Sequence, residues 1–376
     1  MITYEDIGVT PVINASGMMT RLGGASLSPA VASAMAHAGA AYVDMDVLKQ
    51  RAGAMIAKWA GAESAWVTCG AGAGIAIMTA ACVAGTDPRR IERLPNADWQ
   101  PREIVVQSGH LINFGAPIAQ MIRLGGGEPR PVGWANATPA ELFAASLDDH
   151  VAAVLFVQSH HCVQKGMLPL ADVIRLAHGR GIPVLVDAAA ETDLRSYIEA
   201  GADLVTYSGG KAFGGPTSGI ICGKESLVAA CRAQEQGIAR AMKVGKETIM
   251  GLLTALSTYV ARSPTELLAP LTRVAEELLA GLKELPYTRA YIERDEAGRP
   301  IVRLVMQLDE VRLGFTAAAL VDWLARTTPP VMVRTHRVNL GIIAFDPRPL
   351  RPPDVPVVIR LVREAYASLR SGGAQS

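Results

Sequence analysis

One lysine, Lys211, lies in a run of glycines, "TYSGGKAFGGPTSG" (residues 206–219), that contains no other charged residue. A solvated surface lysine needs no glycine neighbours, whereas a lysine that must approach a bulky planar group needs backbone without side chains. Removal from water lowers the pKa of an amine and makes it nucleophilic, which is the property needed to form a Schiff base. Lys211 is therefore a candidate catalytic amine.

Three further candidate groups follow strand-like segments. The turn formed by Gly70, Ala71 and Gly72 follows "SAWVT" and begins a helix-like segment, His110 follows "EIVVQS", and Asp187 follows "PVLV" and precedes three alanines. A glycine-rich turn before a helix presents backbone N–H groups to an anion, and a buried carboxylate needs a cation or a strong donor. Each group also has a structural interpretation: helix packing for the turn, an ordinary polar role for His110, and a helix N-cap for Asp187.

The elements that must position these groups alternate between strand-like and helix-like segments. Apolar runs of strand length recur from residue 65 to about 205: "AWVTC", "EIVVQS", "AAVLFVQS", "PVLVDAAA" and "ADLVTYS". This pattern predicts an α/β fold with a mostly parallel sheet covered by helices. Ligands bind at the carboxyl ends of such strands, so the loops would combine an anion cup, a ring-stacking imidazole, a carboxylate for a ring nitrogen and an amine. That set matches pyridoxal 5'-phosphate (PLP).

The domain organisation follows from a change of pattern after about residue 258. A long amphipathic segment, "PTELLAPLTRVAEELLAGLKEL", is followed by "YIERDEAGRPIVRLVMQL", which predicts a hairpin, and then by further helices and strands. We expect an N-terminal segment at 1–40, a large PLP-binding α/β domain at 41–258 and a small α+β domain at 259–376.

Composition excludes several classes of function. The 376 residues carry a formal charge of +1, so we expect no nucleic-acid or membrane partner. The five cysteines show no metal spacing, which predicts reduced thiols, a cytoplasmic protein and no metal site. "MITYEDIGVT" does not resemble a targeting signal, and the uncharged stretch 64–86 is interrupted by glycines, so we interpret it as a buried strand, turn and helix.

Several motifs resemble a known family. The order of glycine turn, histidine, Asp-x-Ala and Ser-x-x-Lys is similar to fold-type I PLP enzymes. "INASGMMTRLG", "SGGKAFGGPTSGIICG" and "GIARAMKVGKETIMGLLTAL" resemble the selenocysteine synthase (SelA-like) group. "YVDMDVLKQRAG", "QSGHLINFGAPIAQMIRLGGGEP", "SHHCVQKGM" and "VDAAAETDL" resemble the branch of that group that contains D-glucosaminate-6-phosphate ammonia-lyase. These motifs span residues 12 to about 260.

The resemblance implies roles for individual residues. Lys211 would hold PLP through a Schiff base and later move protons, and Asp187 would pair with the pyridinium nitrogen. His110 would stack on the ring, and Ala189 would touch its opposite face. The cofactor phosphate would be held by Ser208, Gly70, Ala71 and Gly72.

The implied reaction is an α,β-elimination that releases ammonia from a 2-amino-3-hydroxy acid, with D-glucosaminate 6-phosphate as the substrate of the named branch. The leaving hydroxyl needs an acid, for which His160 and His161 in "QSHHC" are both candidates.

The carboxylate and the phosphate of such a substrate need basic residues other than Lys211 to bind them. Arg240, Lys243 and Lys246 occur at intervals of three, which suggests partial alignment on one helix face, although a solvated basic face has equal weight. The resemblance to fold-type I enzymes also implies that an arginine of the small domain receives the substrate carboxylate. "PPVMVRTHRVNLG" offers Arg334 and Arg337 for this role, and strand alternation favours Arg334.

One departure from the branch concerns the position after "INASG". Relatives often carry a lysine there, whereas this chain has Met18. If that lysine binds substrate, a different and unphosphorylated amino acid becomes a candidate.

Other PLP chemistry stays open. A selenium transferase would need a basic RNA-binding surface, an aminotransferase or racemase could use the same residues, and a non-enzymatic relative would be expected to lose Lys211 or Asp187. Because sites of fold-type I enzymes are usually completed by a neighbouring subunit, we expect a homodimer or a higher homo-oligomer.

Overall fold

The computed structural model describes residues 2–159, 161–295 and 299–372. The chain divides into two compact units, one formed by 27–261 and the other by 1–26 together with 262–376. The predicted division set residues 1–40 apart instead. Residues 1–26 group with the C-terminal part because β1 (Ile13–Ala15) pairs in parallel with β11 (Val331–Val333).

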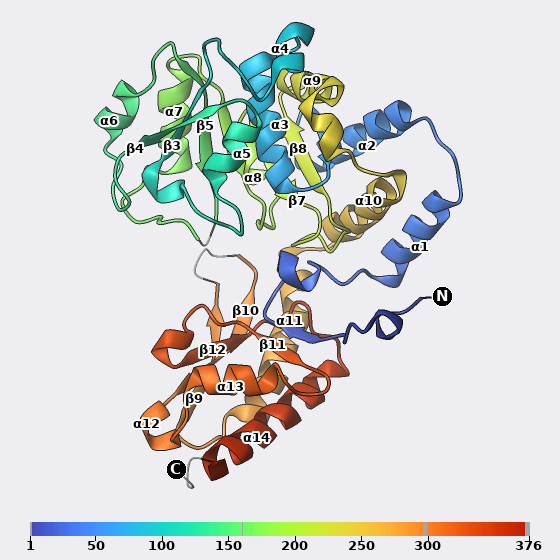
Figure 1. The fold of residues 1–376 in the computed structure, drawn as a ribbon, viewed down its shortest axis with the longest axis vertical. Coiled ribbons are helices and arrows are strands. Elements are labelled where there is room, and N and C mark those ends of the chain that lie inside the picture. Colours follow the sequence, from blue (N-terminus) through green and yellow to red (C-terminus); the bar gives the residue numbers. More distant parts are fainter. Residues whose placement is uncertain (1, 160, 296–298, 373–376) are drawn as a thin grey trace. The chain divides into compact units, whose positions relative to one another are not determined.

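A seven-stranded sheet forms the centre of the larger unit, in the order β2-β8-β7-β6-β5-β3-β4 (Figure 1). All pairs are parallel except those of β8, which runs antiparallel to both β2 and β7. The strands are β2 (Ser64–Thr68), β3 (Glu103–Gln107), β4 (Glu128–Val132), β5 (Val151–Val157), β6 (Val184–Asp187), β7 (Leu204–Ser208) and β8 (Gly219–Gly223). The predicted α/β fold with a mostly parallel sheet is confirmed.

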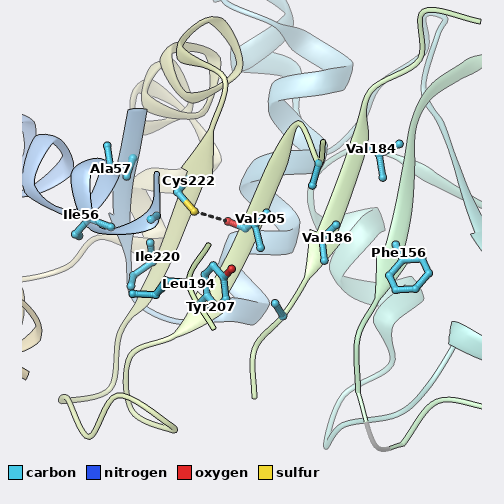
Figure 2. Close-up of a cluster of buried hydrophobic side chains, with 14 of the residues drawn as sticks. Ile56, Ala57, Phe156, Val184, Val186, Leu194, Val205, Tyr207, Ile220 and Cys222 are labelled. Carbon is cyan, nitrogen blue, oxygen red and sulfur yellow. Dashed lines mark hydrogen bonds between the residues drawn. The ribbon is translucent and has the colours of Figure 1, made fainter. Parts of the chain in front are cut away.

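Helices cover both faces of this sheet. Successive residues of a strand point to opposite faces, so they enter two different hydrophobic clusters. Val184 and Val186 of β6 belong to one hydrophobic cluster, shown in Figure 2, whereas Leu185 belongs to a second. The first cluster includes residues of α2 (Met45–Ala60), α6 (Ala140–Ala145), α7 (Leu170–His178) and α10 (Lys246–Val260). The second includes residues of α3 (Ala71–Ala84), α4 (Pro88–Arg93), α5 (Ile118–Leu124) and α9 (Glu225–Ala233). The remaining helices of this unit are α1 (Pro29–Gly39) and α8 (Ser196–Glu199).

The uncharged stretch 64–86 forms β2, a turn at Gly70 and α3, as the sequence predicts. Most residues of α3 are buried, which explains why the helix carries no charge. No helix in the described part of the chain is long and apolar enough to cross a membrane.

The smaller unit contains a three-stranded antiparallel sheet in the order β12-β10-β9. Its strands are β9 (Thr288–Arg294), β10 (Val302–Leu308) and β12 (Ile342–Phe345), and β9 and β10 form the predicted hairpin. The helices are α11 (Pro264–Leu282), α12 (Glu310–Leu313), α13 (Ala317–Leu324) and α14 (Asp354–Gly372). A capping box between Ser263 and Glu266 begins α11.

Candidate active site

Lys211 lies in the loop between β7 and β8 and is half-buried. The glycines around it allow the loop to fold back tightly: Gly209 N donates to Ser218 O at 2.9 Å, and a Cβ on Gly209 would lie 2.2 Å from Ser218 Oγ. Gly214, which has a φ of +68°, donates to Lys211 O at 3.0 Å. The glycines therefore shape the loop that presents the lysine.

Asp187 is the last residue of β6 and is buried. It is paired in register with Val157 of β5 and Thr206 of β7, so it lies at the carboxyl ends of adjacent parallel strands. Burial raises the pKa of its carboxyl to about 6, against the hydrogen bond from Ala189 N and the positive charge of Lys211, which lower the pKa. The positive charge of the amine thus favours the ionised form of Asp187. A cationic ring beside Asp187 would favour the same form.

The N-cap interpretation of Asp187 is wrong. Its Oδ1 accepts from Ala189 N at 3.0 Å, and the next helix, α8, begins only at Ser196. Ala189 is half-buried and its carbonyl accepts from Ser208 N at 3.3 Å, so Ala189 and Ser208 are brought together across the ends of β6 and β7.

The glycine turn lies between β2 and α3. Gly70 is the N-cap residue of α3, and a Cβ at Gly70 would meet no atom within 4 Å. Thr68 Oγ1 donates to Gly70 O at 2.9 Å, which fixes the turn. The first N–H groups of a helix have no acceptor within the helix, so Ala71 and Gly72 present donors at the positive end of the helix dipole.

His110 follows β3 and is fully buried. Its ring lies edge-on to Phe156, with centroids 4.7 Å apart, and burial lowers its pKa to about 4. A fully buried ring exposes no face, so the stacking role stays a prediction that requires a movement of His110 or its cover.

The two histidines after β5 differ in what the structure describes. His160 lies outside the described residues. His161 is exposed, and its backbone N–H donates to Ser159 Oγ at 3.2 Å. The choice between them as the acid stays open.

Comparisons with known proteins agree with this arrangement. The model of the family "SelA: L-seryl-tRNA selenium transferase" matches residues 12–285. A 5'-C-glycyluridine monooxygenase-decarboxylase from a Streptomyces species is 43% identical over 373 residues, which are 99% of this chain and 93% of that protein. A D-glucosaminate-6-phosphate ammonia lyase from Salmonella typhimurium (strain 14028s / SGSC 2262) is 40% identical over 361 residues, covering 96% and 97% of the two chains.

A solved structure of D-glucosaminate-6-phosphate ammonia-lyase has a TM-score of 0.89 and 39% identity to this chain, with coverage of 97% of this chain and 98% of the other. The chain belongs to the SelA family. It is an enzyme, and the resemblance inferred from its motifs is confirmed.

The basic residues predicted to bind the substrate of this SelA-family enzyme are arranged differently from the prediction. Arg240 lies in a 3-10 turn (Ile238–Met242) that ends before Lys243, and α10 begins only at Lys246. The expected alignment on one helix face is therefore wrong, because the extended residue Lys243 and Gly245 interrupt the helical path. Arg240 and Lys243 are exposed, whereas Lys246 Nζ donates to Gly39 O at 3.0 Å and to Glu247 Oε1 at 2.6 Å.

Arg334 and Arg337 differ in their partners. Arg337 forms a two-bond ion pair with Glu293, at 3.1 and 2.6 Å. Arg334 follows β11 and pairs with Ala344 through its backbone, and its guanidinium has no hydrogen-bond acceptor among the residues that the structure describes. This difference supports the choice of Arg334 for an anion.

Sequence reasoning did not identify the charged residues around Arg334, which include Arg303, Asp346 and Arg348. The signal was present in "AFDPRP", where an acidic and a basic residue directly follow an apolar strand.

Proposed function

We propose that this SelA-family enzyme is a PLP-dependent ammonia-lyase that acts on a 2-amino-3-hydroxy acid. The observation that carries the proposal is the placement of Asp187 at the end of β6 and of Lys211 in the loop after the adjacent strand β7, where burial raises the pKa of the Asp187 carboxyl and the positive charge of Lys211 opposes that rise. The 40% identity to a D-glucosaminate-6-phosphate ammonia lyase supports the class of reaction.

The residues present fit PLP. Asp187 is a buried acid whose pKa is raised by burial, so a cationic ring nitrogen would stabilise its charged form. Gly70 leaves open space at the first turn of α3 for a phosphate, and the glycines of the Lys211 loop keep side chains away from the amine. Lys211, Asp187, Ala189, Ser208, Gly70, Ala71 and Gly72 would hold the cofactor, and His110 would contact the ring after a local movement.

When bound, PLP withdraws electrons from the α-carbon of the amino acid and makes its proton acidic. Lys211 Nζ would accept that proton, since its loop presents the amine beside Asp187. His160 or His161 would donate a proton to the leaving C3 hydroxyl. Overall, the C2–N bond and the C3–O bond break, one water leaves and one is consumed, and the products are ammonia and a 2-keto-3-deoxy acid.

The preferred substrate is D-glucosaminate 6-phosphate, which has an anionic group at each end. Arg240 and Lys243 are exposed and could bind the phosphate, with Lys246 fixing the turn through Gly39. Arg334 is proposed to receive the carboxylate, since it has no acceptor in the described part of the chain.

A second candidate is an oxidative decarboxylation like that named for the Streptomyces relative, which is 43% identical. A glycyl group on C5' of uridine is also an amino acid with a hydroxyl on the neighbouring carbon, so both names describe one class of substrate. Met18, which replaces an expected lysine, is the residue that favours an unphosphorylated substrate.

We also propose a homodimer or higher homo-oligomer in the cytoplasm. Several large apolar side chains near the start of α2 are exposed, and Tyr42 is fully exposed. All five cysteines are free thiols, as a reducing compartment would allow. Light scattering should give at least twice the monomer mass of 39.7 kDa, and a strictly monomeric active enzyme would exclude the oligomer.

The deciding experiment has two readouts. Protein reconstituted with PLP should absorb in the visible, and Lys211→Ala should lose that band. The wild type should then release ammonia and 2-keto acid from D-glucosaminate 6-phosphate under argon as fast as in air. A need for O₂ together with release of CO₂ would establish the second candidate instead, and colourless protein would remove the PLP proposal.

A further inference from the structure

A second buried acid, Glu191, follows Asp187 by four residues in the loop after β6. Asp187 and Glu191 are each 7% exposed. An ionised carboxylate is rarely buried without a partner, and two carboxylates in one loop repel each other. The reaction proposed for Lys211 uses Asp187 and leaves Glu191 without a role.

Backbone hydrogen bonds hold this loop against the neighbouring strand. Ala188 N donates to Thr206 O of β7 at 2.9 Å. Glu191 N donates to Ala188 O at 3.0 Å, so the chain turns between Asp187 and Glu191. The turn fixes the backbone of both acids relative to the end of the sheet.

The carboxylate of Glu191 acts on two neighbours. Its Oε2 accepts a hydrogen bond from the hydroxyl of Tyr197 at 3.3 Å, which ties the loop to α8. Burial is the main cause of the raised pKa of Asp187, and the negative charge of Glu191 raises that pKa further. Glu191 is therefore close enough to Asp187 to influence its ionisation.

A series of four aromatic side chains leads from Glu191 to the loop that carries Lys211. We call it the aromatic chain; in order of contact it consists of Tyr197, Tyr207, Phe213 and Tyr259. Successive ring centroids are 6.5, 5.9 and 5.0 Å apart, which is the range of favourable aromatic contacts. Tyr207 is labelled in the hydrophobic cluster of Figure 2, so the aromatic chain belongs to the core on that face of the sheet.

Both ends of the aromatic chain meet the same loop. Tyr197 donates to Glu191, and at the other end the hydroxyl of Tyr259, in α10, donates to Thr192 O at 2.7 Å. Phe213, within the chain, follows Lys211 by two residues. The acid-bearing loop and the lysine loop are thus attached to one set of rings, and Glu191 is one of the points of attachment.

The titratable groups beside the two acids come from neighbouring strands and loops. Burial raises the pKa of Asp187 and Lys211 lowers it, whereas burial and the charge of Asp187 raise the pKa of the Cys162 thiol to about 12. Burial is also the main cause of the raised pKa of the Tyr207 hydroxyl, to which Glu191 contributes. The thiol and the hydroxyl are therefore neutral. Two carboxylates and one amine leave an excess of negative charge that a bound cation would balance.

We propose that Glu191 is a positioning residue of the candidate active site: it fastens the Asp187 loop to the aromatic chain, and its carboxylate adds a second negative charge that helps Asp187 to retain a cationic ring. Asp187 touches the ring, and Glu191 acts through Asp187. The proposal rests on the proposed function for the identity of the ring. The coupling between the two acids is a property of the chain itself.

The first experiment measures this coupling without cofactor or turnover. Urea unfolding of the cofactor-free, full-length chain is compared for the wild type, Asp187→Asn, Glu191→Gln and the double variant, at pH 7 and pH 4. At pH 7, the stability gained by Asp187→Asn should be smaller in the Glu191→Gln background, by at least about twofold in the unfolding equilibrium constant. At pH 4 the folded state holds Asp187 protonated, so the coupling should disappear. An equal gain in both backgrounds at pH 7 overturns the proposal.

Two further variants separate this coupling from general effects on stability. Glu199→Gln is the matched control, because Glu199 is an exposed acid of the same helix, paired with Arg195 on the surface. It should show no coupling with Asp187→Asn. Tyr197→Phe removes only the hydroxyl that holds Glu191, so it keeps the proposal testable if Glu191→Gln does not fold. It should reduce the gain from Asp187→Asn at pH 7, and an unchanged gain would show that Tyr197 does not position Glu191.

The second experiment uses the PLP-loaded protein. Glu191→Gln should release PLP at least about twofold faster than the wild type during dialysis, followed by the visible absorbance, because one of two negative charges is lost. Glu191→Asp keeps the charge and should release PLP more slowly than Glu191→Gln. Release from Glu191→Gln at the wild-type rate would overturn the proposal, and equal release from both variants would show that the charge of Glu191 does not act on the ring.

The two experiments also separate this proposal from the proposed function. A wild type that shows the coupling between Asp187 and Glu191 but stays colourless with PLP would remove the proposed function alone. An enzyme that binds PLP and releases ammonia but shows no coupling would remove only the role of Glu191.

Discussion

The backbone amide of Val157 donates a hydrogen bond to Nδ1 of His110 at 3.3 Å, so the proton of the neutral imidazole lies on Nε2. Nε2 itself has no hydrogen-bond partner among the described residues. The donor of a fully buried ring is therefore available to any polar group that enters beside β5. Such unsatisfied donors are uncommon in folded proteins and occur at sites that bind other molecules.

Protonation of His110 should destabilise the protein in acid. The folded pKa of about 4 lies below the ordinary value of 6.5, so the unfolded chain takes up the proton first and stability falls as the pH decreases from 6.5 to 4. A shift of this size corresponds to about 3 kcal/mol. His110→Gln does not titrate, and urea midpoints of the two proteins at pH 7, 5.5 and 4.5 should converge or cross as the pH falls. A constant difference would contradict this assignment.

Asp187→Asn should stabilise the protein when the cofactor is removed. The folded pKa of about 6 lies above the ordinary 3.8, so the folded state keeps its proton longer, and stability is lost as the pH rises from 3.8 through 6. The variant should gain up to about 3 kcal/mol at pH 7 and nothing at pH 4. With PLP bound, turnover should fall far more than cofactor content. If, at pH 7 and without PLP, the variant is less stable than the wild type, the charge of the buried Asp187 carboxylate does not destabilise the folded protein.

Gly219→Ala should weaken retention of the cofactor. A Cβ on Gly219 would lie 2.4 Å from the carbonyl carbon of Gly70 and 2.4 Å from Thr68 Oγ1, so the turn before α3 would have to move. Release of PLP, followed by the visible absorbance during dialysis, should be faster in the variant. Gly39→Ala is the matched control, since its Cβ would meet only Glu247 Cγ, at 3.7 Å. Equal retention in both variants would show that the turn does not hold the phosphate.

Lys243→Ala should raise KM for D-glucosaminate 6-phosphate about tenfold to a hundredfold, because a charge-assisted contact to the phosphate is lost. Turnover of a short unphosphorylated amino acid should not change, since the contact is remote from the reacting carbon. Lys58→Ala, at another exposed lysine, should leave both values unchanged. If the wild type has the same KM for phosphorylated and unphosphorylated substrates, it does not recognise the phosphate, and Met18 becomes the residue to test.

The sequence was sufficient to predict the parallel sheet and the loops that carry the candidate site. Continuous apolar runs and glycine-rich turns are local signals: Asp187 directly follows one such run, and Lys211 lies in the glycine-rich turn after the next. Two strands of the seven-stranded sheet were not predicted: β4 contains two prolines in "EPRPV", and β8 was hidden in the glycine-rich segment after Lys211. Strand propensity alone does not identify such segments, because contacts with the neighbouring strands decide whether they form a strand.

Other features depend on contacts that no local pattern specifies. The interruption of the helical path at Lys243 follows from an extended residue and a glycine, which the regular spacing of three cations concealed. The charged residues around Arg334, which include Arg303, Asp346 and Arg348, come from separate segments of the chain, and each reads individually as a surface charge. The full burial of His110 reflects its packing on Phe156 of a different strand.

Pairing of β1 with β11 matches Ile13 to Val331, so β1 waits for a partner that is synthesised 318 residues later. At ribosomal rates of roughly 5–20 residues per second, that interval is on the order of 15–60 s. Residues 27–261 can complete their own sheet during this time, while the first segment stays without its strand partner. The order of folding during translation thus differs from the order of the chain: residues 27–261 can fold first, and β1 is fixed only after β11 has been made.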